Sequence, residues 1–319
     1  MQKNKLFITG AAGFVGSTLV DAALREGCQV IGLDNFRTGR RAFLEHALYH
    51  SNFTLIEGDV RDASCYCRFI SPDVTVVHLA ANADVKDGFS DIWRDFNENA
   101  MATLTLLECM VANGCRRILF SSTGSVYGDA NVHPTPENGP FPVQTSLYAS
   151  SKLYAEALLT SFYENNLIEG AIFRFVSLTG PRYSHGHIFD FVNRLTLDPE
   201  SLVCLGNGYQ TKSYLHVDDC IRAVMQVIQS GNTDMQIFNL GVSSTCNVRQ
   251  SIGWISDEMG VSPTVKYGTE KRGWVGDSPY ILLDTAKIKG TGWKPKWSIE
   301  ESVRITTRYL IENKWLFPK

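Results

Sequence analysis

The sequence predicts an α/β protein with a Rossmann-type doubly wound parallel sheet and a smaller, mixed C-terminal lobe. Short apolar runs alternate with helical segments through the first 125 residues or so, and a glycine-rich turn, Gly10–Gly16, follows the first run. The apolar runs are continuous, which is typical of strands buried on both faces of a sheet. The length of 319 residues suits a nucleotide-binding domain that carries a second lobe.

Each expected element follows from its local pattern. The first apolar run ends on Gly10, the second ends on Asp34, and the Asp218-Asp219 pair begins the last clear helix. Strands are expected over Lys5–Thr9, Gln29–Leu33, Thr54–Glu57, Thr75–His78, Arg117–Ser121 and Ala171–Phe175. Helices are expected over Gly16–Arg25, Asp95–Asn113, Leu147–Asn165 and Val217–Ser230. Strands separated by helices of this length indicate right-handed βαβ crossovers.

The regular alternation breaks up after about Thr179. Pro181, Pro199 and the Gly206–Gly208 stretch mark loops. We therefore expect a dinucleotide-binding domain over 1–176, to which a segment of about 214–242 returns. Residues 177–319 are expected to form a smaller, interleaved lobe.

Composition excludes several classes of function. The formal net charge of −3 gives no general attraction to nucleic acid or anionic membranes, and no apolar run is long enough to span a bilayer. The N-terminus does not resemble a signal peptide. The eight cysteines are scattered and indicate neither a zinc site nor a disulfide framework, so we expect a reduced, cytoplasmic protein without a metal.

The Gly10–Gly16 turn predicts a dinucleotide site. Glycines allow a tight turn and a close approach to a pyrophosphate, which then lies on N–H groups at a helix N-terminus. Asp34 ends the second strand, where a carboxylate accepts from the adenosine ribose and favours NAD over NADP. The alternative is NADP, whose extra phosphate would be held by nearby arginines. These arginines are Arg37, Arg40 and Arg41.

Tyr148 and Lys152 are four residues apart, so they share one face of the expected helix. An ammonium near a phenol favours the phenolate and lowers its pKa, which suits a general base. Tyr267 and Lys271 have the same spacing. Only Tyr148 follows a strand that ends in hydroxyl side chains, Ser121 to Thr123, at the edge where ligands bind. We therefore predict that Tyr148 is the acid/base.

Together these features resemble nucleotide-sugar epimerases of the extended short-chain dehydrogenase/reductase family, in particular the UDP-galactose 4-epimerase group. The motifs that carry the resemblance, besides the glycine turn, are Asp34-Asn35, His78–Ala81, Ser121–Gly128, Tyr148–Lys152, Gly180–Arg182 and Gly292–Pro295. The resemblance implies that Thr123, Tyr148 and Lys152 are catalytic. The cofactor-binding residues that we predict from the turn and the resemblance are Gly10, Gly13, Phe14, Val15, Gly16, Asp34, Asn35, Asp59, Val60, Leu79, Ala80, Ala81, Asn99, Tyr148, Lys152 and Phe175.

The resemblance also implies a substrate site. Its expected residues are Lys86, Thr123, Tyr148, Ser177, His187, Lys212, Arg272 and Asp277. Ser177 stands where most relatives have Asn, and Lys212-Ser213 stand where many have Arg-Asp. Arg272 and Asp277 are separated by four residues instead of two, which puts the role of Arg272 in doubt.

The expected reaction is NAD-dependent 4-epimerisation of a UDP-sugar. Relatives that eliminate water usually carry Asp-Glu directly after the catalytic Ser/Thr, and here these places hold Gly124 and Ser125. The alternatives are epimerisation of a UDP-N-acetylhexosamine or UDP-hexuronate, an NADP-linked keto-sugar reductase, and a non-catalytic dinucleotide sensor. The resemblance further implies a homodimer formed through a four-helix bundle of the helices over Asp95–Asn113 and Leu147–Asn165.

Overall fold

The computed structural model describes residues 4–83, 85, 88–140, 143–274 and 277–317. The chain forms two compact units. The first unit consists of 1–126, 146–174 and 221–238, and the second unit of 127–145, 175–220 and 239–319. This division differs from the expected one mainly at 127–145, which the structure groups with the second unit.

The first unit is built around a seven-stranded sheet in the order β11-β6-β5-β4-β1-β2-β3. Its strands are β1 (Lys5–Thr9), β2 (Gln29–Asp34), β3 (Phe53–Glu57), β4 (Val74–His78), β5 (Arg117–Thr123), β6 (Glu169–Phe175) and β11 (Gln236–Leu240). β1 pairs in parallel with both β2 and β4, so the strand order reverses around β1. The predicted doubly wound α/β fold is confirmed.

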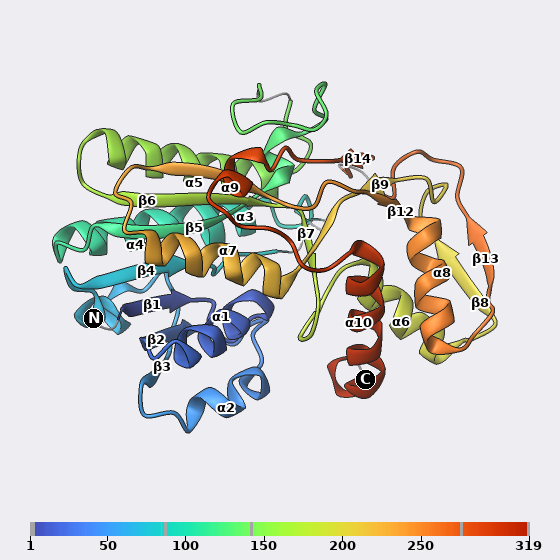
Figure 1. The fold of residues 1–319 in the computed structure, drawn as a ribbon, viewed down its shortest axis with the longest axis horizontal. Helices are drawn as coiled ribbons and strands as arrows, with labels where there is room; N and C mark the ends of the chain where they lie inside the picture. The colour runs from blue at the N-terminus through green and yellow to red at the C-terminus, as the bar shows by residue number, and fades with distance from the viewer. Residues whose placement is uncertain (1–3, 84, 86–87, 141–142, 275–276, 318–319) are drawn as a thin grey trace. The chain divides into compact units, whose positions relative to one another are not determined.

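Helices cover both faces of this sheet, with α1 and α7 on one and α4 and α5 on the other (Figure 1). The helices are α1 (Phe14–Arg25), α2 (Glu45–Leu48), α3 (Ile92–Asp95), the π-helical η4 (Phe96–Met101), α4 (Ala102–Ala112), α5 (Leu147–Glu164) and α7 (Val217–Ser230). A large apolar core, which includes Phe7, Leu106 and Leu159, joins the sheet to α4 and α5. Burial on both faces is the physical reason for the unbroken apolar runs in the strands.

The helix expected over Asp95–Asn113 is interrupted. It divides into α3, η4 and α4, and Asn99 lies within the π-helical turn. A π turn inserts an extra residue and is frequent at functional sites. Apolar periodicity does not reveal such an insertion.

The second unit contains small sheets and a helical layer. Its strands are β7 (Ser177–Thr179), β8 (Ser201–Cys204), β9 (Thr211–Lys212), β10 (Tyr214–His216), β12 (Cys246–Asn247), β13 (Thr264–Tyr267) and β14 (Tyr280–Ile281). Its helices are α6 (His187–Leu197), α8 (Val248–Met259), α9 (Ala286–Gly290) and α10 (Ile299–Glu312). The Gly292–Pro295 segment places the buried Trp293, whose indole N–H donates to the Asp219 carbonyl at 2.9 Å.

The expectation that the cysteines form no disulfide was wrong at one pair. Cys67 and Cys109 are joined, with their Cα atoms 5.9 Å apart, although 42 residues separate them in the chain. The fold brings the short turn before β4 against α4, which no local spacing encodes. No helix in the described part of the chain is long and apolar enough to cross a membrane.

Candidate active site

The glycine turn between β1 and α1 is shaped for close approach. Gly10 has φ +69°, and a Cβ there would lie 2.9 Å from the Ala80 amide nitrogen. A Cβ on Gly16 would lie 2.0 Å from the Gly10 carbonyl oxygen. Gly13 is the N-cap of α1 and has no side chain with which to cap it, and the N-terminus of a helix favours an anionic group. This cradle fits the pyrophosphate of a dinucleotide.

Asp34 holds the loop that faces this turn. Its carboxylate accepts from the Ala12 and Phe36 amides, both at 2.8 Å, and burial raises its pKa. Each carboxylate oxygen has a second lone pair, so these bonds leave acceptor capacity for a ribose hydroxyl. A Cβ on Gly39 would lie 2.6 Å from the same carboxylate, which explains the glycine there.

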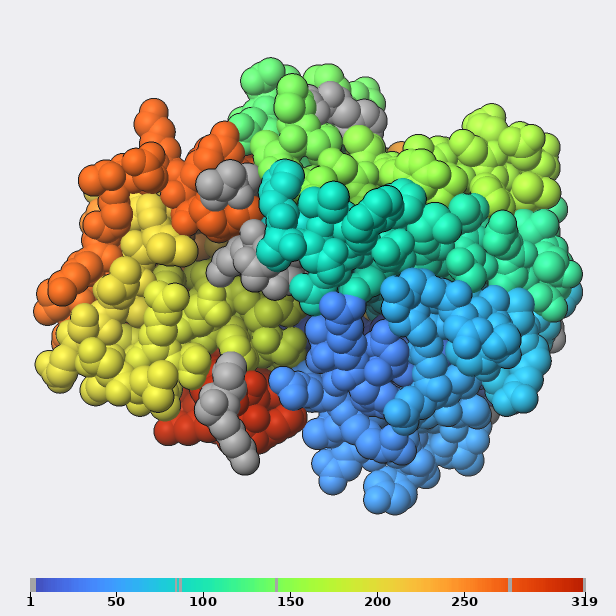
Figure 2. Space-filling view, turned by 180° about the vertical axis from the view of Figure 1, so that it is seen from behind, coloured from blue at the N-terminus to red at the C-terminus, as the bar shows by residue number. Residues whose placement is uncertain are grey.

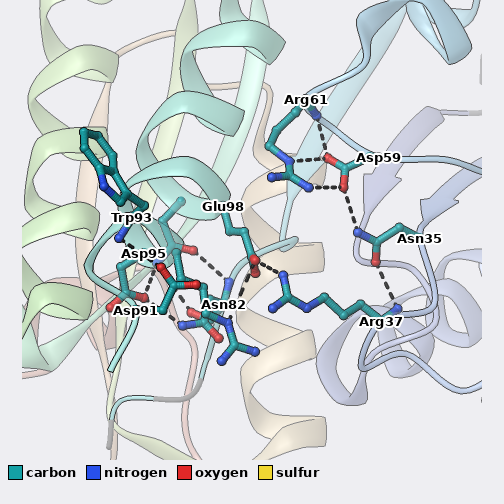
Figure 3. A network of polar contacts seen from close by, with 11 residues as sticks. Asn35, Arg37, Asp59, Arg61, Asn82, Asp91, Trp93, Asp95 and Glu98 are labelled. Atoms are coloured by element: carbon teal, nitrogen blue, oxygen red, sulfur yellow. Dashed lines mark hydrogen bonds and ion pairs between the residues drawn. The ribbon is translucent and has the colours of Figure 1, made fainter. Parts of the chain in front are cut away.

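Asn35 and Asp59, which the sequence predicts as cofactor residues, contact each other. The Asn35 amide donates to Asp59 at 2.9 Å, and Arg61 donates to both carboxylate oxygens at 2.9 and 2.8 Å (Figure 3). The Arg61 guanidinium holds the pKa of Asp59 well below its usual range. The sequence did not indicate that Arg61 would neutralise this carboxylate. Val60 beside it is buried in the core.

His78 supports the end of β4 as a neutral ring. Its Nδ1 lies 2.7 Å from the Thr9 hydroxyl oxygen and its Nε2 lies 3.1 Å from that of Thr103. The Thr9 hydroxyl oxygen also accepts from the Leu79 and Ala80 amides at 3.1 Å. Burial lowers the pKa of His78 to about 3. These contacts position the predicted cofactor segment Leu79–Ala81 beside the glycine turn.

Asn99 belongs to a buried amide network. Its side-chain oxygen accepts from the Asn82 amide at 2.8 Å, and its side-chain nitrogen donates to the Ser151 hydroxyl at 2.9 Å. Asp95 accepts from the Asn82 side chain at 2.8 Å (Figure 3). The sequence predicted Asn99 but not these partners, which come from three separate segments.

The predicted catalytic residues lie together in the first unit. Thr123, the last residue of β5, lies beside the Tyr148 phenol at the start of α5, and its hydroxyl lowers the pKa of that phenol. The Thr123 oxygen also accepts from the Ser125 amide at 3.1 Å, which orients it. The Lys152 ammonium is buried, donates to the Ser121 carbonyl at 2.8 Å and lies 4.7 Å from the centre of the Phe120 ring.

The expected lowering of the Tyr148 pKa was wrong for the chain as folded. Burial raises the pKa of Tyr148 to about 12, and the nearby Asp95 carboxylate adds to the shift, while the Thr123 hydrogen bond opposes it. Lys152 shares the helix face with Tyr148, but its ammonium donates to the backbone of β5. Burial also lowers the pKa of Lys152 to about 7, against the opposing carboxylates of Glu156 and Asp95.

Glu156 continues the same face of α5 one turn beyond Lys152. The Arg174 guanidinium of β6 donates to both of its carboxylate oxygens, through Nε at 3.0 and 3.2 Å and through a second nitrogen at 2.6 Å. The Ser122 hydroxyl also donates to Glu156. The ion pair is buried, with Arg174 only 1% exposed. The sequence analysis did not include Glu156 or Arg174, although the spacing of four residues from Lys152 is a signal for Glu156.

In the second unit, the structure brings three of the predicted substrate residues together. Lys212 pairs with Asp277, and Asp277 also accepts from the Gly273 amide at 3.0 Å. The Arg272 guanidinium donates to the Asp277 carbonyl and pairs with the Asp129 carboxylate at 2.5 Å. The Asp129 carboxylate raises the pKa of Arg272 further. Asp129 was not predicted.

The other predicted residues lie apart from this cluster. His187 begins α6, and its Nε2 lies 2.9 Å from the Ser251 hydroxyl oxygen. Ser177 is exposed on β7, and Phe175 is a half-buried residue at the end of β6. Lys86 lies outside the described residues. Tyr267, the second Tyr of the Tyr–Lys spacing, lies on β13 under the Arg249 guanidinium.

Among the described residues, His, Cys, Asp and Glu side chains form no group of three that could hold a metal ion.

A family model described as the NAD dependent epimerase/dehydratase family matches residues 6–241. The chain belongs to this family. This match confirms the resemblance found in the sequence, and the cofactor of this family is NAD.

Three similar proteins show the range of this epimerase/dehydratase family. A crystal structure of a UDP-galactose 4-epimerase is 30% identical with a TM-score of 0.87, over 98% of this chain and all of the other. UDP-glucuronic acid decarboxylase 1 of Xenopus tropicalis is 29% identical over 96% of this chain and 72% of its own length. The UDP-glucuronic acid 4-epimerase of Bacillus cereus, solved with UDP-glucuronic acid and NAD, is 26% identical with a TM-score of 0.87, over 97% and 99% of the two chains.

Proposed function

We propose that this protein catalyses the NAD-dependent 4-epimerisation of a nucleoside-diphosphate hexose of the UDP-glucose/UDP-galactose type. The observation that carries the proposal is the pairing of Tyr148 with Thr123, directly followed by Gly124 and Ser125. An elimination of water needs an acid and a base beside the sugar, and neither side chain after Thr123 can serve as one at neutral pH. Epimerisation needs no further acid or base.

The residues of the chain divide the work of the reaction. The Thr123 hydroxyl has one hydrogen, which it donates to the phenolate of Tyr148. Tyr148 takes the proton of the sugar 4-hydroxyl. NAD, when bound, would supply the acceptor for the hydride of C4 and the donor that restores it. Tyr148 then gives the proton back, so the oxygen regains its hydrogen and the cycle is redox-neutral.

The hydroxyls and ammonium around the phenol offset the cost of its ionisation. A pKa near 12 for Tyr148 leaves little phenolate at neutral pH, so positive charge near the phenol increases its basic form. Lys152 is the cation that the chain itself supplies, on the next turn of α5. Glu156 and Asp95 favour its charged form. We therefore assign Lys152 the role of tuning Tyr148 and holding the nicotinamide ribose.

We propose that residues of the second unit bind the nucleoside diphosphate. Lys212 and Arg272 are cations suited to phosphate, and the carboxylate of Asp277 is suited to the ribose hydroxyls of the nucleoside. Each cation is already paired with a carboxylate. Binding of a diphosphate therefore involves an exchange of ion-pair partners.

The direct test is incubation of the purified protein with UDP-glucose, UDP-N-acetylglucosamine and UDP-glucuronate, followed by separation of the products. We expect UDP-galactose from UDP-glucose without a lasting, stoichiometric build-up of NADH. Conversion of only the N-acetylated or the uronate sugar would identify one of the alternative epimerases, for which the small, exposed Ser177 leaves room. Release of carbon dioxide from UDP-glucuronate would contradict the proposed reaction.

We also propose a homodimer formed through the surface of α3, η4, α4 and α5. The rings of Trp93, Phe96 and Tyr154 follow one another, with centroids 6.2 and 6.5 Å apart. Trp93 is 64% exposed, and Tyr154 is 47% exposed. Figure 2 shows the teal and green segments that hold these residues side by side on this face. A run of exposed aromatic rings favours an interface. Light scattering tests this proposal by comparing the molar mass of Phe96→Glu with that of the unaltered protein.

A further inference from the structure

An ion pair joins two segments at the carboxyl edge of the sheet in the first unit. Arg37 lies in the loop after β2, and Glu98 lies in the π turn of η4 (Figure 3). The Glu98 carboxylate is largely buried at 17% exposure, and the Nε of Arg94 lies 3.9 Å from the same oxygen. Arg37 reaches this carboxylate from the other segment.

The sheet order explains where this contact lies. β1 lies between β4 and β2, and the Gly10–Gly16 turn follows the carboxyl end of β1. The loop after β2 lies on one side of the turn, and η4, which follows β4 in the chain, lies on the other. Ligands of open α/β sheets bind in the crevice where the strand order reverses. The Arg37–Glu98 pair therefore joins the segments on either side of the Gly10–Gly16 turn, where we propose that the dinucleotide binds.

The charges along this rim are almost all paired. Arg41 lies 3.6 Å from Glu57, and Arg61 binds Asp59 through two hydrogen bonds. Asp34 accepts from backbone amides. Arg40 is exposed, and its side chain has no hydrogen bond or ion pair among the described residues. Arg37 is three residues past Asp34, in the loop where an arginine of NADP enzymes holds the 2′-phosphate.

We propose that Glu98 is a specificity-determining residue, which occupies Arg37 and thereby excludes the 2′-phosphate of NADP from the adenosine end of the crevice. A phosphate monoester carries a charge of about −1.5 to −2 at neutral pH. It would have to displace Glu98 from Arg37, and the displaced carboxylate would then repel it. NAD has only a hydroxyl at this position, so it leaves the ion pair intact. The inference rests on the dinucleotide site of the proposed function.

The test compares dissociation constants for NAD and NADP, measured by titration calorimetry on protein freed of bound dinucleotide. Glu98→Gln should tighten NADP binding about tenfold, because the freed Arg37 gains a charge-assisted hydrogen bond to phosphate. The dissociation constant of NAD should stay within about twofold of its original value, because NAD makes no use of the freed charge. The double variant Glu98→Gln/Arg37→Ala should lose the gain in NADP affinity.

Glu57→Gln is the matched control, since it removes the same charge from the same rim but frees Arg41. An equal gain from Glu57→Gln would overturn the proposal, because general electrostatics would then explain the selectivity. No gain from Glu98→Gln, or a gain that persists without Arg37, would also overturn it. If the unaltered protein binds neither dinucleotide, the proposed function fails. If it binds NAD but the variants do not change NADP binding as expected, only the role of Glu98 fails.

Discussion

The two units of this protein hold their polar side chains in different ways. In the first unit, His78, Asn99 and Thr123 are bound by hydroxyls, amides and backbone groups, and all three are buried. In the second unit, the cations Lys212 and Arg272 are bound by carboxylates, and Arg272 and Asp129 are partly exposed. The polar groups of the first unit are therefore held by neutral partners, whereas the diphosphate site that we propose in the second unit requires an exchange of ion-pair partners. Four predictions test this difference.

The largest expected effect is on catalysis in the first unit. Tyr148→Phe should lower kcat about 10³-fold, because the variant keeps the ring but loses the group that moves the proton. The affinity for NAD should change little. Turnover is measured by product separation, and Tyr267→Phe is the control, because Tyr267 also has a lysine four residues later. Equal losses in the two variants would contradict the catalytic assignment.

The next effect is on stability. Glu156→Gln should lower the free energy of unfolding by about 3–5 kcal/mol, because it leaves the buried Arg174 without its counter-charge. Urea unfolding measures this change. In the second unit, Glu300→Gln removes one of the carboxylate partners of Arg304 from a more exposed pair, with N and O atoms 2.9 Å apart, and should cost less than about 1 kcal/mol. Similar losses of unfolding free energy in the two variants would show that burial of an ion pair does not set its contribution to stability.

The third prediction concerns the loss of stability at low pH. His78 has a folded pKa of about 3 against 6.5 when exposed, so the unfolded chain takes up a proton first as the pH falls. Its contribution to stability is complete above pH 6.5 and is lost toward pH 3, at about 1.4 kcal/mol per pH unit. His78→Gln should flatten the dependence of unfolding free energy on pH between 6.5 and 5. An unchanged slope would show that His78 takes up its proton while folded.

The smallest effect is expected at the exposed pair of the second unit. Asp129→Asn should change the unfolding free energy by less than about 1 kcal/mol. It should also lower KM for the UDP-sugar a few-fold, since Arg272 no longer has to leave a carboxylate before it meets phosphate. Asp257→Asn, which loosens another exposed pair with Arg304 at 3.2 Å, should leave KM unchanged. A rise in KM from Asp129→Asn would show that Asp129 helps to place Arg272.

Much of the first unit follows from local sequence. The expected bounds of β1 and α7 match the structure, and those of β2, β4 and α5 differ by one residue at an end. Such agreement arises because a strand buried on both faces needs an unbroken apolar run, and a helix between strands needs one apolar face. The glycine turn, Asp34 and the Tyr148–Lys152 spacing were recognisable for a similar reason, because neighbours in the chain build them.

The sequence alone thus determined the sheet and the family, and it predicted the side chains to which we assign catalysis. The tertiary structure decided the partners of those side chains. Asn99 contacts Asn82 and Ser151, Arg272 contacts Asp129, and Arg37 contacts Glu98, each across many residues of chain. The tertiary structure also decided the π turn of η4 and the Cys67–Cys109 disulfide. Charge, hydrogen bonding and burial depend on distances in space, and these exist only once the chain has folded.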